Sequence, residues 1–203
     1  MNANPTPRRS KDKVRRMTGI AIFTSIVVVL QIVCTFVRFG PFSITLALAP
    51  IIIGAALYGV GAGAFLGAVF GAVVLITGLF GWDGGTVMYL MSMNAFATVL
   101  ICVGKGLAAG WVSGVLYRLI AKKSVNGGAI TAGVLCPITN TGLFIVGMMV
   151  FFLSTLESWA GGQAIMYYVI FGLTGMNFLV ELAVNLLLSA GITRIIRASK
   201  HLS

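Results

Sequence analysis

Long apolar stretches, separated by short polar or glycine-rich segments, make up most of this 203-residue chain. Six stretches stand out, at about residues 17–37, 44–58, 63–80, 89–117, 129–153 and 164–194. Several exceed the roughly 20 residues with which an α-helix crosses a hydrocarbon core about 30 Å thick. The pattern predicts an all-α integral membrane protein with six transmembrane helices. It divides the chain into an N-terminal tail at 1–16, a membrane domain at 17–197 and a C-terminal tail at 198–203.

The composition agrees with this class. Hydrophobic residues form 59% of the chain and charged residues 9%. Soluble domains carry about 25% charged residues, so the composition excludes a soluble domain. The first apolar stretch is long and lacks a small-residue cleavage site, which argues against a signal peptide.

The formal net charge of +10 would suggest nucleic-acid binding in a soluble protein, but its distribution argues otherwise. A six-span arrangement places 12 of the 14 Lys and Arg residues on one side of the membrane. Cytoplasmic loops carry an excess of Lys and Arg, so we expect both termini in the cytoplasm. The basic charge then sets topology and holds anionic headgroups. The 12 residues are Arg8, Arg9, Lys11, Lys13, Arg15, Arg16, Arg118, Lys122, Lys123, Arg194, Arg197 and Lys200.

Three polar residues interrupt the last apolar stretch at a helical spacing. Asn177, Glu181 and Asn185 lie four residues apart and share one face of a helix. A lipid-facing carboxylate would cost roughly 2.5–3.5 kcal/mol or more. This face is therefore expected to look into protein or into a water-filled cavity.

Two further polar residues fall at a similar depth. Lys105 lies 13 residues before Arg118, as Glu181 does before Arg194, which places both roughly 20 Å above the inner charged edge. Asn140 lies only slightly lower, and Pro137 is expected to break its helix and expose backbone groups. Lys105 and Glu181 are open to three interpretations: a buried ion pair that fixes helix register, ligand contacts, or a proton relay. Asn140 and its threonine neighbours either frame a ligand site or repair the break.

Small residues recur at the spacing of close helix packing. Gly59, Gly63, Gly67 and Gly71 form one seam, and Gly106, Gly110 and Gly114 form a second; each allows another helix backbone to approach closely. Pro50 is expected to bend the second span. Ala21 and Ser25 offer either an intramolecular packing face or a docking face for a partner helix.

Enzymatic chemistry finds no support in the sequence. There is no Walker motif, no carboxylate cluster for a metal and no nucleophile beside a base. The three cysteines are widely spaced in apolar stretches and are interpreted as core residues. We therefore expect no catalytic residues, no metal site and no cofactor. Trp82 and Trp159, in the outer loops, serve either as interfacial anchors or as parts of a lid.

Four segments resemble the substrate-binding S components of energy-coupling factor (ECF) vitamin transporters. Residues 45–59 (TLALAPIIIGAALYG) and 63–71 (GAFLGAVFG) are similar to the second and third helices of that family. Residues 137–142 (PITNTG) and 177–185 (NFLVELAVN) resemble the fifth and last helices of its pantothenate-type members. The family's first helix usually carries Ala-x-x-x-Ala; here Ser25 replaces the second alanine, and serine is still small.

The resemblance implies a membrane-embedded binding subunit that captures a small vitamin outside and releases it inside. It would dock through Ala21 and Ser25 on a transmembrane coupling protein driven by two ATPases, in a bacterial plasma membrane. Pantothenate is the first candidate substrate, since it carries a carboxylate, an amide and hydroxyls. Carried over by position, the pocket would draw on Asn94, Lys105, Asn140, Thr141, Asn177 and Glu181.

Two alternatives from other classes stay open. A self-sufficient secondary transporter would use Lys105 and Glu181 as a proton relay, although no convincing inverted repeat supports it. A scaffold protein would hold the two residues as a structural pair and bind no small molecule.

Overall fold

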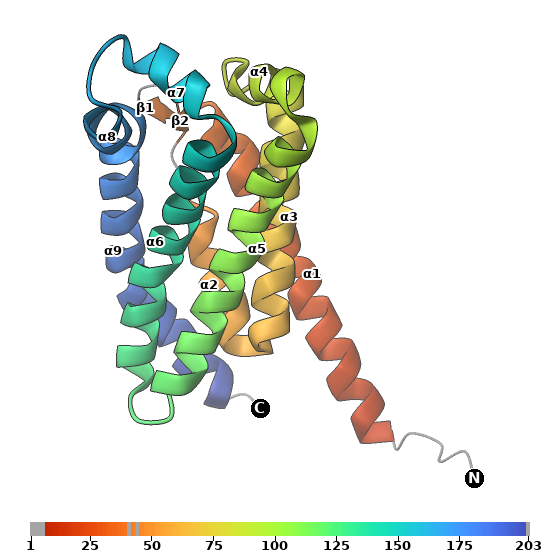
Figure 1. The fold of residues 1–203 in the computed structure, drawn as a ribbon. Helices are drawn as coiled ribbons and strands as arrows, with labels where there is room; N and C mark the ends of the chain where they lie inside the picture. The colour runs from red at the N-terminus through yellow and green to blue at the C-terminus, as the bar shows by residue number, and fades with distance from the viewer. Residues whose placement is uncertain (1–6, 40–41, 44, 202–203) are drawn as a thin grey trace.

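The computed structural model describes residues 7–39, 42–43 and 45–201, and it is almost entirely helical (Figure 1). Several side chains within these ranges, including that of Asn177, lie outside the description. The elements are α1 (Pro7–Thr35), β1 (Arg38–Phe39), β2 (Phe42–Ser43), α2 (Leu48–Tyr58), α3 (Val60–Leu79), α4 (Thr86–Met93), α5 (Ala95–Ile120), α6 (Val125–Phe151), α7 (Leu153–Ala160), α8 (Ile165–Tyr167), the π-helix η1 (Tyr168–Thr174) and α9 (Gly175–His201). β1 and β2 pair antiparallel as a small hairpin.

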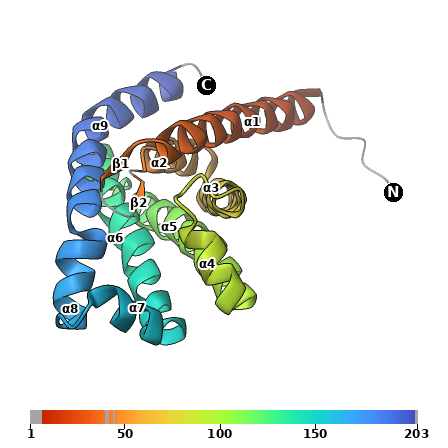
Figure 2. The same ribbon diagram turned by 90° about the horizontal axis from the view of Figure 1, so that it is seen from above.

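The helices form an upright bundle in which α2 is central. The long helices contact one another in the order α3, α5, α6 and α9, while α2 touches α1, α3, α5, α6 and α9 (Figure 2). The first helical residues of α1 and the last of α9 lie at the end of the bundle opposite α4 and α7 (Figure 1). We call these the terminal end and the α4–α7 end.

Four helices are long and apolar enough to cross a membrane: α1 over Lys11–Thr35, α3, α5 and α6. Leu48–Tyr58 and Phe178–Leu188 are shorter apolar helices. The all-α class is confirmed. α1 begins at Pro7, within the stretch predicted as a tail, so its basic residues continue the first helix beyond the apolar part.

The two glycine seams face each other between α3 and α5. A side-chain Cβ at Gly67 would meet the backbone carbonyl of Gly106, and one at Gly63 would meet the carbonyl of Gly110. The prediction that each seam accommodates another helix backbone is confirmed for Gly63, Gly67 and Gly71, whose partner is the second seam and its neighbours on α5. It was wrong for Gly59, which lies in the turn between α2 and α3, where a Cβ would meet nothing within 4 Å.

Three sequence-based expectations about helix breaks were wrong. Pro50 does not bend a helix: α2 begins only at Leu48, so the proline lies in the first turn, where its missing N–H costs nothing. Pro137 does not break α6, which continues through it. The predicted span at 89–117 is instead divided at Asn94 into α4 and α5.

Two apolar clusters fill the bundle at different heights. The cluster toward the terminal end includes Ile51, Leu66, Ala109 and Cys136, and the cluster at the α4–α7 end includes Ile101 and Met148. Each of α5 and α6 contributes to both clusters, so the residues between these positions lie at the level where the clusters meet.

Candidate functional site

Polar side chains gather where the two apolar clusters meet. On α5, Lys105 lies between Ile101 of one cluster and Ala109 of the other. On α6, Asn140 lies between Cys136 and Met148 in the same way. α9 packs against α6 and α2, and it supplies Glu181.

This polar layer is buried but incompletely satisfied. Asn140 and Glu181 are each 5% exposed and Asn185 is 1% exposed. Polar atoms buried without a partner cost free energy, so native structures rarely leave several of them together. Five buried atoms of the described residues lack a hydrogen-bond partner: Gln31 Oε1, Tyr117 Oη, Asn140 Oδ1, Glu181 Oε2 and Asn185 Oδ1.

The Glu181 carboxylate is held from one side. Thr45, in the buried non-helical segment before α2, forms a side-chain and a backbone hydrogen bond with it. Asn185 donates its Nδ2 hydrogen to the Glu181 backbone carbonyl, at 2.8 Å. Glu181 Oε2 keeps no partner, so the layer presents a buried acceptor to whatever lies next to it.

Lys105 supplies a cation to the same layer. Its Nζ lies 4.8 Å from the centroid of the Phe144 ring on α6, a cation–π contact. Lys105 lies in the same layer as Glu181, yet these two described side chains form no direct ion pair. The register-fixing pair suggested by the sequence is therefore not formed. The Lys105 side chain is only half-buried.

The remaining predicted site residues take different positions. Thr141 follows Asn140 on α6 and is half-buried. Asn94 lies outside the layer: it is exposed, 11 residues before Lys105, and its Oδ1 caps α5 by accepting the Ala97 N–H at 3.0 Å. Asn177 precedes Glu181 by one turn of α9, but its side chain lies outside the described residues.

Thr45 is the functional candidate that sequence reasoning missed. It belongs to no helix, so no periodicity connects it with the polar face of α9. A lone threonine in an apolar stretch gives no signal of its own, because its role depends on contact with a residue 136 positions later.

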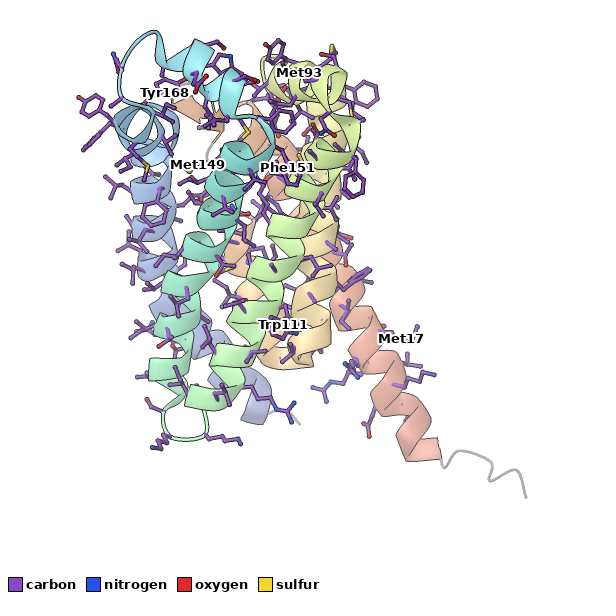
Figure 3. The ribbon with its side chains drawn as sticks, viewed as in Figure 1. Met17, Met93, Trp111, Met149, Phe151 and Tyr168 are labelled. Carbon is purple, nitrogen blue, oxygen red and sulfur yellow. The ribbon has the colours of Figure 1, made fainter. Side chains whose placement is uncertain are left out.

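The α4–α7 end is closed by contacts between those two helices. The Thr155 hydroxyl lies 3.2 Å from the Met93 sulfur, and the rings of Tyr89 and Trp159 are 6.1 Å apart. Below them, Met149 of α6 and Tyr168 of η1 pack on the apolar cluster; Figure 3 labels both, together with Met93. This arrangement covers the polar layer from the α4–α7 end.

Comparison with known proteins identifies the family. Residues 15–193 match the family described as "ECF transporter, substrate-specific component". The chain belongs to this family. It is also 28% identical over 196 residues to the pantothenic acid transporter PanT of Lactococcus lactis subsp. cremoris (strain MG1363), which covers 90% of this chain and 93% of that protein.

Membership makes the protein the substrate-specific component of an ECF transporter, and not an enzyme. Together with its apolar helices, this places it in a bacterial plasma membrane as a multi-pass protein. The two small residues singled out on α1 are both exposed, and the Ser25 hydroxyl donates to the Ala21 carbonyl at 3.2 Å. Ala21 and Ser25 thus form a shallow strip on α1, and the Ser25 hydroxyl is hydrogen-bonded within that helix.

Proposed function

We propose that this S component captures pantothenate from outside the cell and delivers it inward with a transmembrane coupling protein and two ATPases. Six membrane spans with both termini in the cytoplasm would hold the polar layer within the membrane. The substrate would bind between α5, α6 and α9, below the contacts of α4 with α7.

The observation that supports this most is the chemistry of the layer. Lys105 offers a positive charge that no carboxylate of the described residues pairs directly. Asn140 Oδ1 and Glu181 Oε2 are buried acceptors without donors. Pantothenate has complementary groups, with a carboxylate for Lys105 and amide and hydroxyl donors for the acceptors. The similarity of this chain to a pantothenic acid transporter points to the same substrate.

Substrate binding can be tested on the purified protein. Native mass spectrometry should detect a co-purified ligand with the mass of pantothenate, and calorimetry should show saturable binding. Lys105→Ala should abolish binding while the protein still inserts and keeps its helical circular dichroism spectrum. A protein that binds no pantothenate, or a Lys105→Ala variant that binds it normally, would contradict the assignment.

Docking on the coupling protein is the second part of the proposal. The strip at Ala21 and Ser25 is exposed and small, as a helix-packing surface requires. Ala21→Trp should block ATP-dependent uptake into proteoliposomes that contain the whole transporter, and leave pantothenate binding intact. Leu107→Trp, at an exposed apolar position of α5, is the matched control and should leave uptake unchanged. Loss of binding in Ala21→Trp would argue against a separate docking face.

Uptake also distinguishes the alternative function. A secondary transporter with Lys105 and Glu181 as a proton relay would accumulate substrate alone, driven by a proton gradient. The proposed S component requires its partners and ATP.

A further inference from the structure

The non-helical segment before α2 reaches into the polar layer at a single point. Thr45 is 7% exposed, and the next residues Leu46 and Ala47 lead directly into α2. Backbone outside a helix is tolerated at membrane depth only where protein covers it, as it does here. Because Thr45 belongs to no helix, its N–H is free to hydrogen-bond outside its own segment, as its hydroxyl does.

Both of these groups bond to one side chain, the Glu181 carboxylate. Because Glu181 Oε2 has no partner, both hydrogen bonds end on Oε1, and together they hold that oxygen against Thr45. Asn185 does not supply a donor to the carboxylate, because its Nδ2 donates to the Glu181 backbone carbonyl. Glu181 Oε2 is therefore held in place but left without a donor of its own.

We infer that Thr45 is a positioning residue that holds Glu181 so that Oε2 accepts a hydrogen bond from a substrate hydroxyl. This inference rests on the proposed function and adds the orientation of the bound substrate. The carboxylate of the substrate faces Lys105, and its hydroxyl-bearing end faces α9 and Thr45. A substrate without that hydroxyl would leave the buried Oε2 unpartnered, and the site would select against it.

The inference is tested by titrating pantothenate, and its analogue with hydrogens in place of the hydroxyls, into the full-length protein in lipid nanodiscs. Thr45→Val keeps the branched shape and removes the hydroxyl. It should weaken pantothenate binding about tenfold and leave binding of the deoxy analogue unchanged. Glu181→Gln should show the same selective loss. Thr45→Ser, which restores a hydroxyl, should recover most of the affinity for pantothenate.

A buried threonine elsewhere provides the matched control. Thr77 of α3 is 4% exposed, and its hydroxyl donates within its own helix, to Val73 and Val74. Thr77→Val should therefore leave the affinities for both ligands unchanged. This control separates the loss of a buried hydroxyl in general from the loss of the bond to Glu181.

The possible outcomes distinguish a wrong substrate from a wrong role for Thr45. A wild-type protein that binds neither ligand overturns the proposed substrate, and the inference with it. Wild-type binding of pantothenate with no change in Thr45→Val overturns the positioning role alone. Equal weakening of both ligands in Thr45→Val also overturns it, since that result indicates general structural damage. If Thr45→Val does not accumulate, Glu181→Gln and Thr45→Ser decide on the same two ligands.

Discussion

At the scale of single residues, the notable feature is that Lys105 and Glu181 do not contact each other, although both carry ionisable groups. Lys105 and Glu181 lie in one polar layer, but Lys105 contacts the Phe144 ring and Glu181 contacts Thr45. A structural ion pair inside a membrane protein would use the mutual contact to offset desolvation. Here each side chain is supported separately, which leaves both free to act on a ligand.

This difference predicts the outcome of a double-mutant cycle. Lys105→Met and Glu181→Gln remove the charge with little change in side-chain length. Without ligand, their coupling energy should be less than about 1 kcal/mol, because no direct contact is lost. Breaking a buried pair would cost about 3–5 kcal/mol in each single variant, largely recovered in the double variant. Thermal unfolding of the four proteins in one detergent measures the cycle, and such recovery would restore the structural interpretation.

The two tryptophans near the α4–α7 end, Trp159 and Trp82, differ in burial and in the side chains that they contact. Trp159 is half-buried, lies against Tyr89 and packs on the apolar cluster above the polar layer. Trp82 is 43% exposed, and its ring lies 5.6 Å from that of Phe36 and 5.8 Å from that of Phe80. The structure therefore favours a lid role for Trp159 and an interfacial role for Trp82.

We accordingly expect Trp159→Ala to release bound pantothenate faster, with a severalfold higher dissociation rate, since it removes the contact with α4. Trp82→Ala, the matched control, should leave the dissociation rate unchanged. Stopped-flow exchange of radiolabelled ligand in detergent measures both rates. Equal effects of the two substitutions would mean that neither tryptophan acts as a specific closure.

At the scale of elements, periodic signals were predictable and single breaks were not. The glycine seams repeat every four residues, and the structure places them together in the α3–α5 contact. The expectations for Pro50 and Pro137 were wrong because a proline's effect depends on its position in the helix. The hydrophobicity pattern does not define where a helix begins, so it does not define that position. Asn94 ends one helix and caps the next inside a continuous apolar stretch, where no composition change marks the boundary.

The close approach of α3 and α5 gives a prediction at this scale. Gly67→Ala would place a methyl group against the Gly106 carbonyl, so the two backbones must separate. We expect a loss of about 1–3 kcal/mol in unfolding free energy, the range for overpacking. At Gly61 in the same helix, a Cβ would meet nothing within 4 Å. Gly61→Ala is therefore the control and should be neutral or slightly stabilising, as thermal unfolding would show.

At the scale of the whole molecule, the question is how this bundle crosses the membrane. Four helices are long enough to cross alone, whereas α2 has 11 residues and spans roughly 16 Å. The preceding segment extends α2 without helical hydrogen bonds, and its Ala47 is fully buried. Such a composite span is permitted because protein, and not lipid, surrounds its open backbone. With the segment from α8 to α9, this gives the six spans we propose.

Six spans require the turn between α5 and α6 and the helix α7 to lie on opposite sides of the membrane. Lys123, in that turn, and Glu157, on α7, are both exposed and suit single-cysteine labelling. The native Cys34, Cys102 and Cys136 are buried and should contribute little background. Since basic loops stay in the cytoplasm, a membrane-impermeant maleimide should label Glu157→Cys in intact cells, and Lys123→Cys only after permeabilisation. The reverse pattern would invert the proposed orientation, and labelling of both positions in intact cells would contradict six spans.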